Sequence, residues 1–135
     1  MKLASTDAAY IAGFLDGEGS IMLYRRKDRG KVELRITATN THREILEWIM
    51  STTGCGSIIA QGQPNPDKHY PAWHWRIKPS DCVALLEVVR PYLRLKASQA
   101  DLAMEFQQRS DTEGNGLWQE DYRERMAALN RSKWR

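Results

Sequence analysis

The sequence lacks the features that would place the protein in a membrane or in a disulfide-rich class. Among its 135 residues no run approaches about 18 consecutive apolar side chains, so we expect no membrane association through a spanning helix. Residues 1–10 lack a long apolar stretch followed by a cleavage site, so we expect no signal peptide. The two cysteines, Cys55 and Cys82, are not spaced as metal ligands, and they are typical of reduced thiols in a cytosol-like compartment.

Repeats, low-complexity segments and long linkers are also missing. The length therefore suits one domain, residues 1–135, which is large enough to bury a core without disulfides. The three histidines, His42, His69 and His74, are too scattered to predict a metal cluster. Ser20, Ser80 and Ser98 show no accompanying His and Asp relay, so nucleophilic catalysis by a serine is not expected.

The chain does have basic charge, and it is unevenly spread. The formal net charge is +3 with a pI near 9.0, which alone indicates nucleic-acid binding only weakly. Residues 25–35 carry six basic side chains and two acidic ones, and residues 131–135 add three more basic side chains. A basic stripe on one element is typical of a nucleic-acid interface, but Lys and Arg also protect exposed sheet edges. Charge alone leaves both interpretations open.

Hydrophobic periodicity predicts an α+β fold with the element order α-β-β-α-β-β-α-α-α. The predicted helices span residues 6–16, 42–54, 79–92, 95–109 and 117–130. The predicted strands span residues 20–26, 31–39, 56–61 and 72–78. Thr6 or Asp7 is the expected N-cap of the first helix. Two hairpins with one polar face each predict a four-stranded antiparallel sheet whose other face is covered by helices.

The polar face of this sheet is the predicted DNA-binding surface. Residues 31–39 alternate strictly, which places Lys31, Glu33, Arg35 and Thr37 on one face and apolar side chains on the other. Arg and Lys can read guanine edges or bind phosphate, and Glu can accept a hydrogen bond from cytosine. The predicted contacts to double-stranded DNA are Met22, Tyr24, Arg26, Lys31, Glu33, Arg35, Thr37, Gln61, His74 and Arg76. The tryptophans Trp48, Trp73 and Trp75 are expected in the core, whereas Trp118 and Trp134 fit either the core or a dimer contact.

Small residues in the first helix indicate a place where two helices can meet. Ala9, Gly13 and Gly17 are spaced i, i+4 and i+8, so they form a stripe without bulk that favours close approach around a two-fold axis. The alternative is that Gly17 and Gly19 merely end the helix in the left-handed conformation. The predicted interface of a homodimer comprises Ala9, Ala12, Gly13, Asp16 and Gly17.

Two acidic residues, Asp16 and Glu18, stand where this helix must end. A carboxylate at a helix C-terminus faces the negative end of the dipole, which costs a few tenths to about 1 kcal/mol unless a cation is bound. Carboxylate and carbonyl oxygens suit Mg²⁺. If two such helices meet, the Glu18 carboxylates lie near the axis and could support metal-assisted hydrolysis of two phosphodiesters, one in each DNA strand.

The segment YIAGFLDGEGSI resembles the LAGLIDADG motif of homing endonucleases. The segments GCGSI, IKPSD, PYLRLKASQADLA and MAALNRSK resemble, in the same order, segments of the single-motif subgroup, so the resemblance covers nearly the whole chain. It implies an α-β-β-α-β-β-α core, a homodimer, and site-specific cleavage of both strands of a long pseudo-palindromic DNA target. It also implies Mg²⁺ or Mn²⁺ as the cofactor and no small-molecule cofactor.

The resemblance assigns roles to individual residues. Glu18 matches the acidic metal-binding position, where many members have Asp, and Gly17 matches a residue whose carbonyl faces the metal. Lys96 matches a basic residue that would stabilise phosphate charge or tune a water. Asn40 and Arg43 are the candidates for a peripheral polar pair, with His42 as the rival of Arg43, because the spacing departs from the family pattern by about one residue.

The resemblance also leaves rival functions. Asp16 matches an acid whose role lies in the structure of the helix end. A relative that has lost cleavage would act as a repressor or as an RNA maturase, and a general DNA-packaging protein is a third possibility. The presence of Glu18, Gly17 and Lys96 favours the enzyme.

Overall fold

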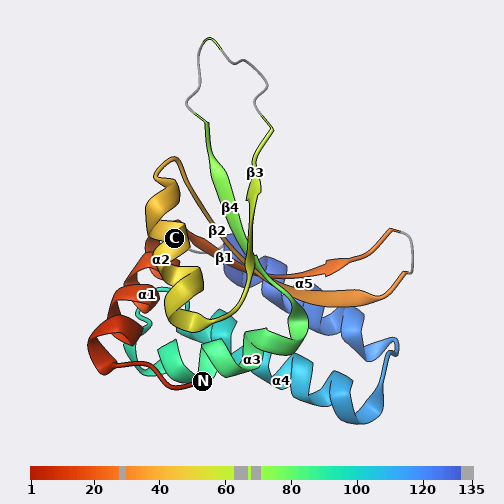
Figure 1. Ribbon diagram of the computed structural model, residues 1–135. Coiled ribbons are helices and arrows are strands. Elements are labelled where there is room, and N and C mark those ends of the chain that lie inside the picture. The colour runs from red at the N-terminus through yellow and green to blue at the C-terminus, as the bar shows by residue number, and fades with distance from the viewer. Residues whose placement is uncertain (28–29, 63–66, 68–70, 132–135) are drawn as a thin grey trace.

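The computed structural model describes residues 1–27, 30–62, 67 and 71–131, and it has an α+β fold in which helices cover one face of an antiparallel sheet (Figure 1). The α-helices of the described residues are α1 (Ser5–Glu18), α2 (Arg43–Thr53), α3 (Pro79–Val89), α4 (Ala97–Glu113) and α5 (Trp118–Arg131), with a 3₁₀ turn η1 (Arg90–Tyr92) after α3. The strands are β1 (Gly19–Arg25), β2 (Val32–Asn40), β3 (Ser57–Ala60) and β4 (Trp73–Ile77). They form a four-stranded sheet in the order β1-β2-β4-β3, and each neighbouring pair is antiparallel. The predicted element order and sheet are confirmed.

Strict alternation along the strands produces the core. The apolar residues of β2, from Val32 to Ala38, are buried at every second position, and the residues between them are half-buried. The helices α3, α4 and α5 contact β2 from the buried side, as Figure 1 shows. Trp75 of β4 is fully buried, and its indole Nε1 donates a hydrogen bond to the Cys55 carbonyl at 3.0 Å. No helix in the described part of the chain is both long enough and apolar enough to cross a membrane.

Both cysteines lie in protected surroundings. Burial raises the pKa of the Cys82 thiol to about 12 and also raises the pKa of the half-buried Cys55 thiol. A thiol whose pKa is raised carries little thiolate at neutral pH and is a poor nucleophile. Both side chains therefore belong to the packing of the fold.

The predicted helix starts were inaccurate at two places. The prediction that Thr6 or Asp7 caps the first helix is wrong, because α1 begins at Ser5 with Ala4 as its N-cap and without a side-chain cap. The helix predicted from residue 95 begins at Ala97 and continues to Glu113, where Gly114 ends it. Residues 94–96 are held in a non-helical segment by hydrogen bonds to the end of α1.

The tryptophans divide between core and surface. The prediction that Trp48 lies in the core is wrong, because its exposed fraction is 37% and its ring packs edge to face on Tyr10 of α1, with the ring centroids 5.4 Å apart. Leu46, Ile49 and Thr53 are the buried residues of α2, and Trp48 therefore projects from another side of that helix. Trp118 packs on Phe106 within the chain. His69, Trp134, part of the basic stretch (residues 28–29) and residues 132–135 lie outside the described residues.

The junction between α1 and β1 is direct, without a loop. Gly19 has extended backbone angles, φ −92° and ψ 169°, so the interpretation that Gly17 and Gly19 end the helix in the left-handed conformation is wrong. Glycine is needed at position 19 because a Cβ there would lie 2.8 Å from the carbonyl oxygen of Leu15. The extended backbone at Gly19 ends the helix at Glu18 and begins the first strand at Gly19 itself.

Candidate nucleic-acid interface and catalytic end

The end of α1 presents Glu18 and Gly17 to solvent. Both residues are exposed, and no hydrogen bond or ion pair within the described part of the chain engages the Glu18 carboxylate. The carboxylate therefore remains at the negative end of a helix dipole without a compensating partner. Such a position is unfavourable for an anion and favourable for a bound cation.

Asp16 has a different role from Glu18, although both are acids at the same helix end. Its carboxylate accepts hydrogen bonds from the backbone N–H groups of Arg94 at 2.8 Å and Lys96 at 3.0 Å. The Lys96 Nζ donates a third hydrogen bond to the Asp16 carbonyl oxygen at 2.6 Å. These bonds bring Lys96 to the end of α1 from 80 residues away, and they make Asp16 part of the structure of the helix end.

The predicted stripe of small residues lies on the surface of α1, whereas one further residue of the predicted interface does not. Ala9, Gly13 and Gly17 are exposed, and a Cβ added at either glycine would meet no atom within 4 Å. Nothing in this chain therefore requires glycine at positions 13 and 17. The prediction that Ala12 belongs to the interface is wrong, because its side chain is fully buried in the core of its own chain. A second copy at this surface stays a prediction.

The donor atoms at the end of α1 suit a hard cation but are few. The described residues contain no group of three or more His, Cys, Asp or Glu side chains that could hold a metal ion. One chain offers the Glu18 carboxylate and the Gly17 carbonyl, and oxygen donors of this kind are preferred by Mg²⁺. The site therefore needs further donors, from water, DNA or a second chain, to complete a coordination shell.

The residues predicted as a peripheral polar pair lie where β2 leads into α2. The antiparallel register, with Gly19 opposite Ala38, places Asn40 at the same end of the sheet as the end of α1. The Asn40 Oδ1 accepts from the His42 N–H at 2.8 Å, and the His42 Nδ1 accepts from the Ile45 N–H at 3.2 Å. His42 is therefore the N-cap of α2.

Arg43 is held by local contacts on α2. Its guanidinium carbon lies 4.3 Å from the centroid of the Trp73 ring, and its Nε donates to Glu47 at 2.8 Å. The contacts of Asn40, His42 and Arg43 are those of a helix start, and a catalytic role for Asn40 and Arg43 stays a prediction.

The predicted DNA-contacting side chains share the open face of the sheet. The register places Met22 opposite Arg35, Tyr24 opposite Glu33, and Thr37 opposite Arg76, and directly opposed residues point to the same face. None of the ten predicted residues is buried: Met22, Tyr24, Arg26, Lys31, Glu33, Arg35, Thr37, His74 and Arg76 are half-buried, and Gln61 is exposed. A contact of each with DNA stays a prediction.

Four of these side chains form a connected cluster, which we call the Tyr24 cluster: Tyr24, Arg26, Glu33 and Arg35. Arg35 Nη2 donates to the Tyr24 hydroxyl at 2.6 Å, and its guanidinium carbon lies 4.0 Å from the centroid of the Tyr24 ring. The Tyr24 hydroxyl donates to Glu33 Oε2 at 3.2 Å, and Arg26 Nη1 donates to Glu33 Oε1 at 3.0 Å. Both carboxylate oxygens of Glu33 therefore have partners.

The other half of the face is built by β3 and β4. His74 Nδ1 and Thr39 Oγ1 lie 2.6 Å apart across the strands. The buried Nε of Arg76 has no hydrogen-bond partner among the described residues. The sequence prediction missed Ser57 and Ile59, which lie opposite Arg76 and His74 on this face. Side chains alternate along a strand, so the placement of Gln61 on this face could have indicated both.

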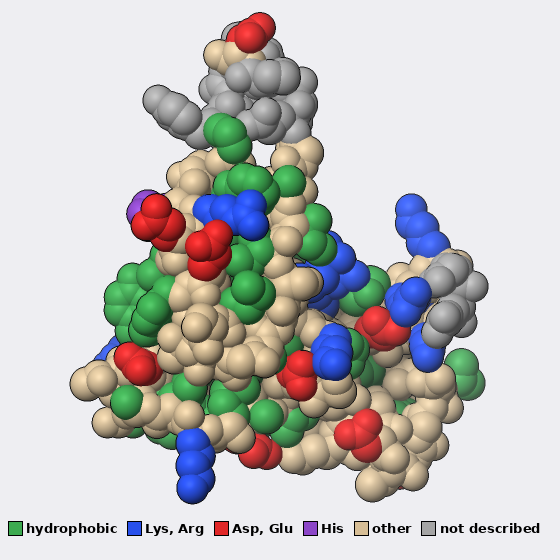
Figure 2. All heavy atoms as spheres, in the orientation of Figure 1, with side chains coloured by type: hydrophobic (Ala, Val, Ile, Leu, Met, Phe, Trp, Pro, Cys, Tyr) green, Lys and Arg blue, Asp and Glu red, His purple; other side chains and the backbone are tan. Residues whose placement is uncertain are grey.

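Basic side chains outnumber acidic ones in the part of the chain that contains the sheet, but not in the C-terminal helices. The described residues between 19 and 78 contain eight Lys and Arg against four Asp and Glu, whereas residues 79–131 contain seven against nine. Figure 2 shows Lys and Arg side chains gathered at the outer end of the hairpin that β1 and β2 form. The positive potential therefore lies on the half of the molecule that carries the open face, where a polyanion would be attracted.

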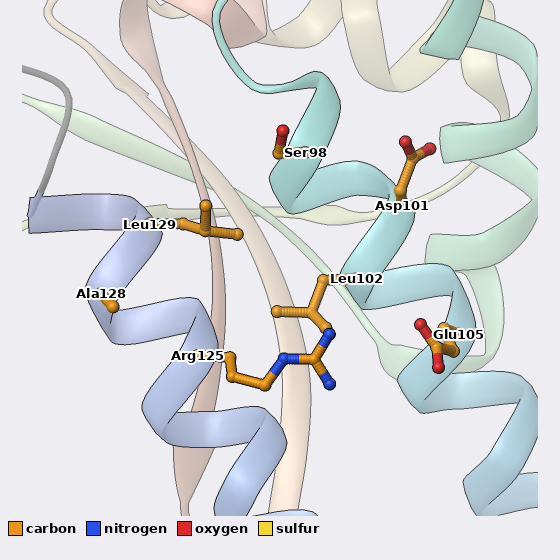
Figure 3. A pocket seen from close by; sticks show the side chains of 7 residues that line it. All are labelled: Ser98, Asp101, Leu102, Glu105, Arg125, Ala128 and Leu129. Carbon is orange, nitrogen blue, oxygen red and sulfur yellow. The ribbon is translucent and has the colours of Figure 1, made fainter.

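A hollow on the helical side of the molecule does not resemble the end of α1, because its acidic side chains already have partners. It measures about 580 Å³ between α4 and α5 and is lined by Ser98, Asp101, Leu102, Glu105, Arg125, Ala128 and Leu129 (Figure 3). Its acids already have partners, because Asp101 pairs with Arg90 and Glu105 accepts from the Tyr122 hydroxyl at 2.7 Å. None of the predicted site residues lines this hollow.

Comparison with known proteins agrees with this geometry. The sequence profile described as LAGLIDADG endonuclease matches residues 11–101. Comparison with curated protein sequences gives no match. Among solved structures, the homing endonuclease I-CvuI in complex with its target in the presence of Ca is 25% identical, with a TM-score of 0.65, and the match covers 78% of this chain and 68% of that chain. I-CvuI is also known with a DNA target and Mg, in a state in which the DNA is not cleaved.

More distant structures share the fold. The archaeal intron-encoded homing endonuclease I-Vdi141I, complexed with DNA, is 20% identical with a TM-score of 0.68, and the match covers 95% of this chain and 82% of that chain. The LAGLIDADG meganuclease I-AabMI, bound to uncleaved DNA, is 16% identical with a TM-score of 0.66. That match covers 92% of this chain but only 45% of the I-AabMI chain.

Proposed function

Because the chain belongs to the LAGLIDADG endonuclease family, we propose that it is a homodimeric homing endonuclease that cuts both strands of a specific DNA site. The proposed target is long and pseudo-palindromic, and residues 1–135 act as one endonuclease domain. The observation that carries the proposal is the end of α1, where the Glu18 carboxylate, without a partner among the described residues, and a lysine from a distant segment lie beside the start of the sheet.

The open face of the sheet is the proposed DNA-binding surface. It combines a basic strand pair with half-buried polar side chains that are aligned in register. A curved antiparallel sheet with such a face can enter a major groove, where Arg and Lys distinguish base pairs. The similar enzyme I-CvuI is described in complex with its DNA target, which supports double-stranded DNA as the partner of this chain.

Glu18 and Gly17 are the proposed ligands of a divalent cation, Mg²⁺ or Mn²⁺. When bound there, the cation would stabilise charge on the phosphodiester and activate a water for hydrolysis. Glu18 supplies an anionic oxygen, and Gly17 supplies its carbonyl oxygen. Lys96 holds a positive charge beside the same helix end, where it can stabilise the phosphate in the transition state. Description of I-CvuI with Ca and with Mg supports the use of a divalent cation.

The proposed homodimer would supply two catalytic ends, one for each DNA strand. Each chain has one motif and one Glu18 carboxylate, whereas cleavage of two strands needs two such ends. Exposed glycines at positions 13 and 17 leave room for a second helix to approach closely.

The experiment compares Glu18→Gln with the unchanged protein on a pool of randomised DNA duplexes. The duplexes are first selected by binding in Ca²⁺, and single-turnover cleavage of the selected duplexes is then measured in Mg²⁺. We expect the Glu18→Gln variant to bind as the parent does but to cut several orders of magnitude more slowly, because the anionic ligand is lost while the shape is kept. Glu87→Gln, an exposed acid on α3, is the matched control and should cut at the parent rate.

Two outcomes would contradict the proposal. Cleavage by Glu18→Gln at the parent rate would place the metal site elsewhere. A parent protein that selects duplexes in Ca²⁺ but never cuts them in Mg²⁺ or Mn²⁺ would be a binding protein of the same family, such as a repressor. A protein that binds structured RNA in preference to the duplex pool would be a maturase.

A further inference from the structure

The Tyr24 cluster holds one guanidinium in a fixed orientation. Arg35 stacks on the Tyr24 ring and also donates to the hydroxyl of the same residue, so two contacts of different kinds restrain it. Glu33 in turn restrains Tyr24, because it lies directly opposite Tyr24 on the neighbouring strand and accepts from its hydroxyl. Arg26 completes the cluster from the end of the hairpin.

We propose, as an extension of the proposed function, that Tyr24 is a positioning residue that presents Arg35 to a guanine in each half of the DNA site. In this arrangement Tyr24 and Glu33 do not read bases themselves. Their polar atoms already have partners inside the cluster, because the Tyr24 hydroxyl donates to Glu33 and accepts from Arg35, and each Glu33 oxygen accepts one hydrogen bond. This differs from the sequence-based expectation that Glu33 accepts a hydrogen bond from cytosine.

The remaining donors of Arg35 suit a guanine edge. A guanidinium has five N–H donors, and the bond to Tyr24 uses one hydrogen of Nη2. Nη2 carries two hydrogens, one on the side of Nε and one on the side of Nη1. The hydrogen that does not bind Tyr24 therefore still forms a pair of parallel donors with Nε or with Nη1. Two parallel donors are what the O6 and N7 atoms of guanine accept in the major groove. A hollow of about 420 Å³ lined by Tyr24, Arg26, Lys27 and Arg35 leaves room for such an edge.

The carboxylate of Glu33 favours base reading over phosphate binding. A cluster that served to grip a phosphate would be weakened by an anion at its centre, because the anion repels phosphate and neutralises a neighbouring cation. A base edge carries no net charge and is not repelled in this way. Fixing a long side chain before DNA binds also lowers the conformational cost of making a directional contact.

The experiment selects duplexes from a randomised pool in Ca²⁺ with the parent protein, with Tyr24→Phe and with Arg35→Ala. Tyr24→Phe keeps the ring and removes both hydrogen bonds of the hydroxyl, the one from Arg35 and the one to Glu33. Tyr122→Phe is the matched control, because it removes a hydroxyl–carboxylate bond of the same kind in the helical layer. Binding is then titrated over a range of salt concentrations, and thermal melting establishes that each variant is folded.

We expect the parent to select a G·C pair at one symmetric pair of positions. Arg35→Ala should reduce the preference for that pair by about tenfold or more. Tyr24→Phe should reduce it several-fold at the same positions while the salt dependence of binding stays unchanged. A variant that carries both Tyr24→Phe and Arg35→Ala should lose no more preference for the G·C pair than Arg35→Ala alone, since Tyr24 acts through Arg35.

Three results would overturn the inference. A Tyr24→Phe variant that selects the parental sequence with the parental preference would show that the hydroxyl bond does not position Arg35. A uniform loss of affinity for all duplexes, with a shallower salt dependence, would assign Arg35 to phosphate binding. If the parent binds duplexes but selects no sequence, or does not bind them, the proposed function fails and this inference fails with it.

Discussion

Replacing Asp16 by Asn tests the conclusion that two neighbouring acids have separate tasks. Asp16 joins the end of α1 to the segment before α4 through two backbone hydrogen bonds to its carboxylate. The Asn side chain keeps one acceptor oxygen but turns an amide NH₂ toward a backbone N–H, so one of the two bonds is lost. Glu18→Gln removes a carboxylate two residues away that has no bond to any described residue.

The bonds to Asp16 have an estimable effect on stability. A hydrogen bond to a charged group contributes about 1.5–3 kcal/mol when it is well protected. One of the two bonds is exposed and the other is half-buried, so we expect Asp16→Asn to lower the free energy of unfolding by about 1–2 kcal/mol. For a chain of this length the melting temperature should fall by roughly 3–8 °C. Glu18→Gln should leave stability unchanged or slightly raised, because the helix dipole disfavours the anion.

The two variants should also differ in activity. Because the Lys96 Nζ is bonded to the backbone of Asp16, a shift of this segment displaces the lysine. We expect Asp16→Asn to cut DNA roughly ten- to a hundredfold more slowly, whereas DNA binding in Ca²⁺ through the distant sheet face should persist. Urea denaturation at one fixed protein concentration, followed by single-turnover cleavage, measures both effects. If Asp16→Asn unfolds at the parental urea concentration while Glu18→Gln is destabilised, the two roles have been assigned the wrong way round.

Three further changes test other parts of the structure. Gly13→Leu should prevent the approach of two α1 helices, and sedimentation velocity should then find a monomer that no longer cuts; an intact, active dimer would refute the proposed interface. Gly19→Ala should lower the free energy of unfolding by about 1–3 kcal/mol in urea, because its Cβ meets the Leu15 backbone, and an unchanged midpoint would contradict that contact. The Arg123 and Arg25 guanidinium groups hold the pKa of Glu120 at about 2, below its ordinary 4.5, so this pairing stabilises the fold fully above about pH 5 and loses its effect as the pH falls toward 2. Glu120→Gln should therefore lower the melting temperature at pH 7 but not near pH 2, and an equal loss at both pH values would argue against the ion pair.

Local patterns predicted most of the fold because they report on burial along one element at a time. The alternation in residues 31–39 predicts which face of β2 is buried, and every apolar position there lies in the core. The same kind of local reasoning failed for Trp48, since a large apolar side chain was assigned to the core without regard to its position on α2. It also failed for Ala12, because small size alone does not reveal whether a helix residue faces a partner or its own core.

The sequence by itself determined the element order, the open face of the sheet and the acids at the end of α1, because periodicity and residue type can be recognised within one short segment. The resemblance assigned Asp16 to the structure of the helix end, but only the tertiary structure decided its partners: Asp16 is bonded to Arg94 and Lys96, some 80 positions away, and Glu18 is left exposed. The tertiary structure alone also decided that Tyr24, Glu33 and Arg35 form one connected cluster, since that depends on the register between two strands. Contacts between distant segments depend on how elements pack, and no local pattern encodes the distance between two side chains on different elements.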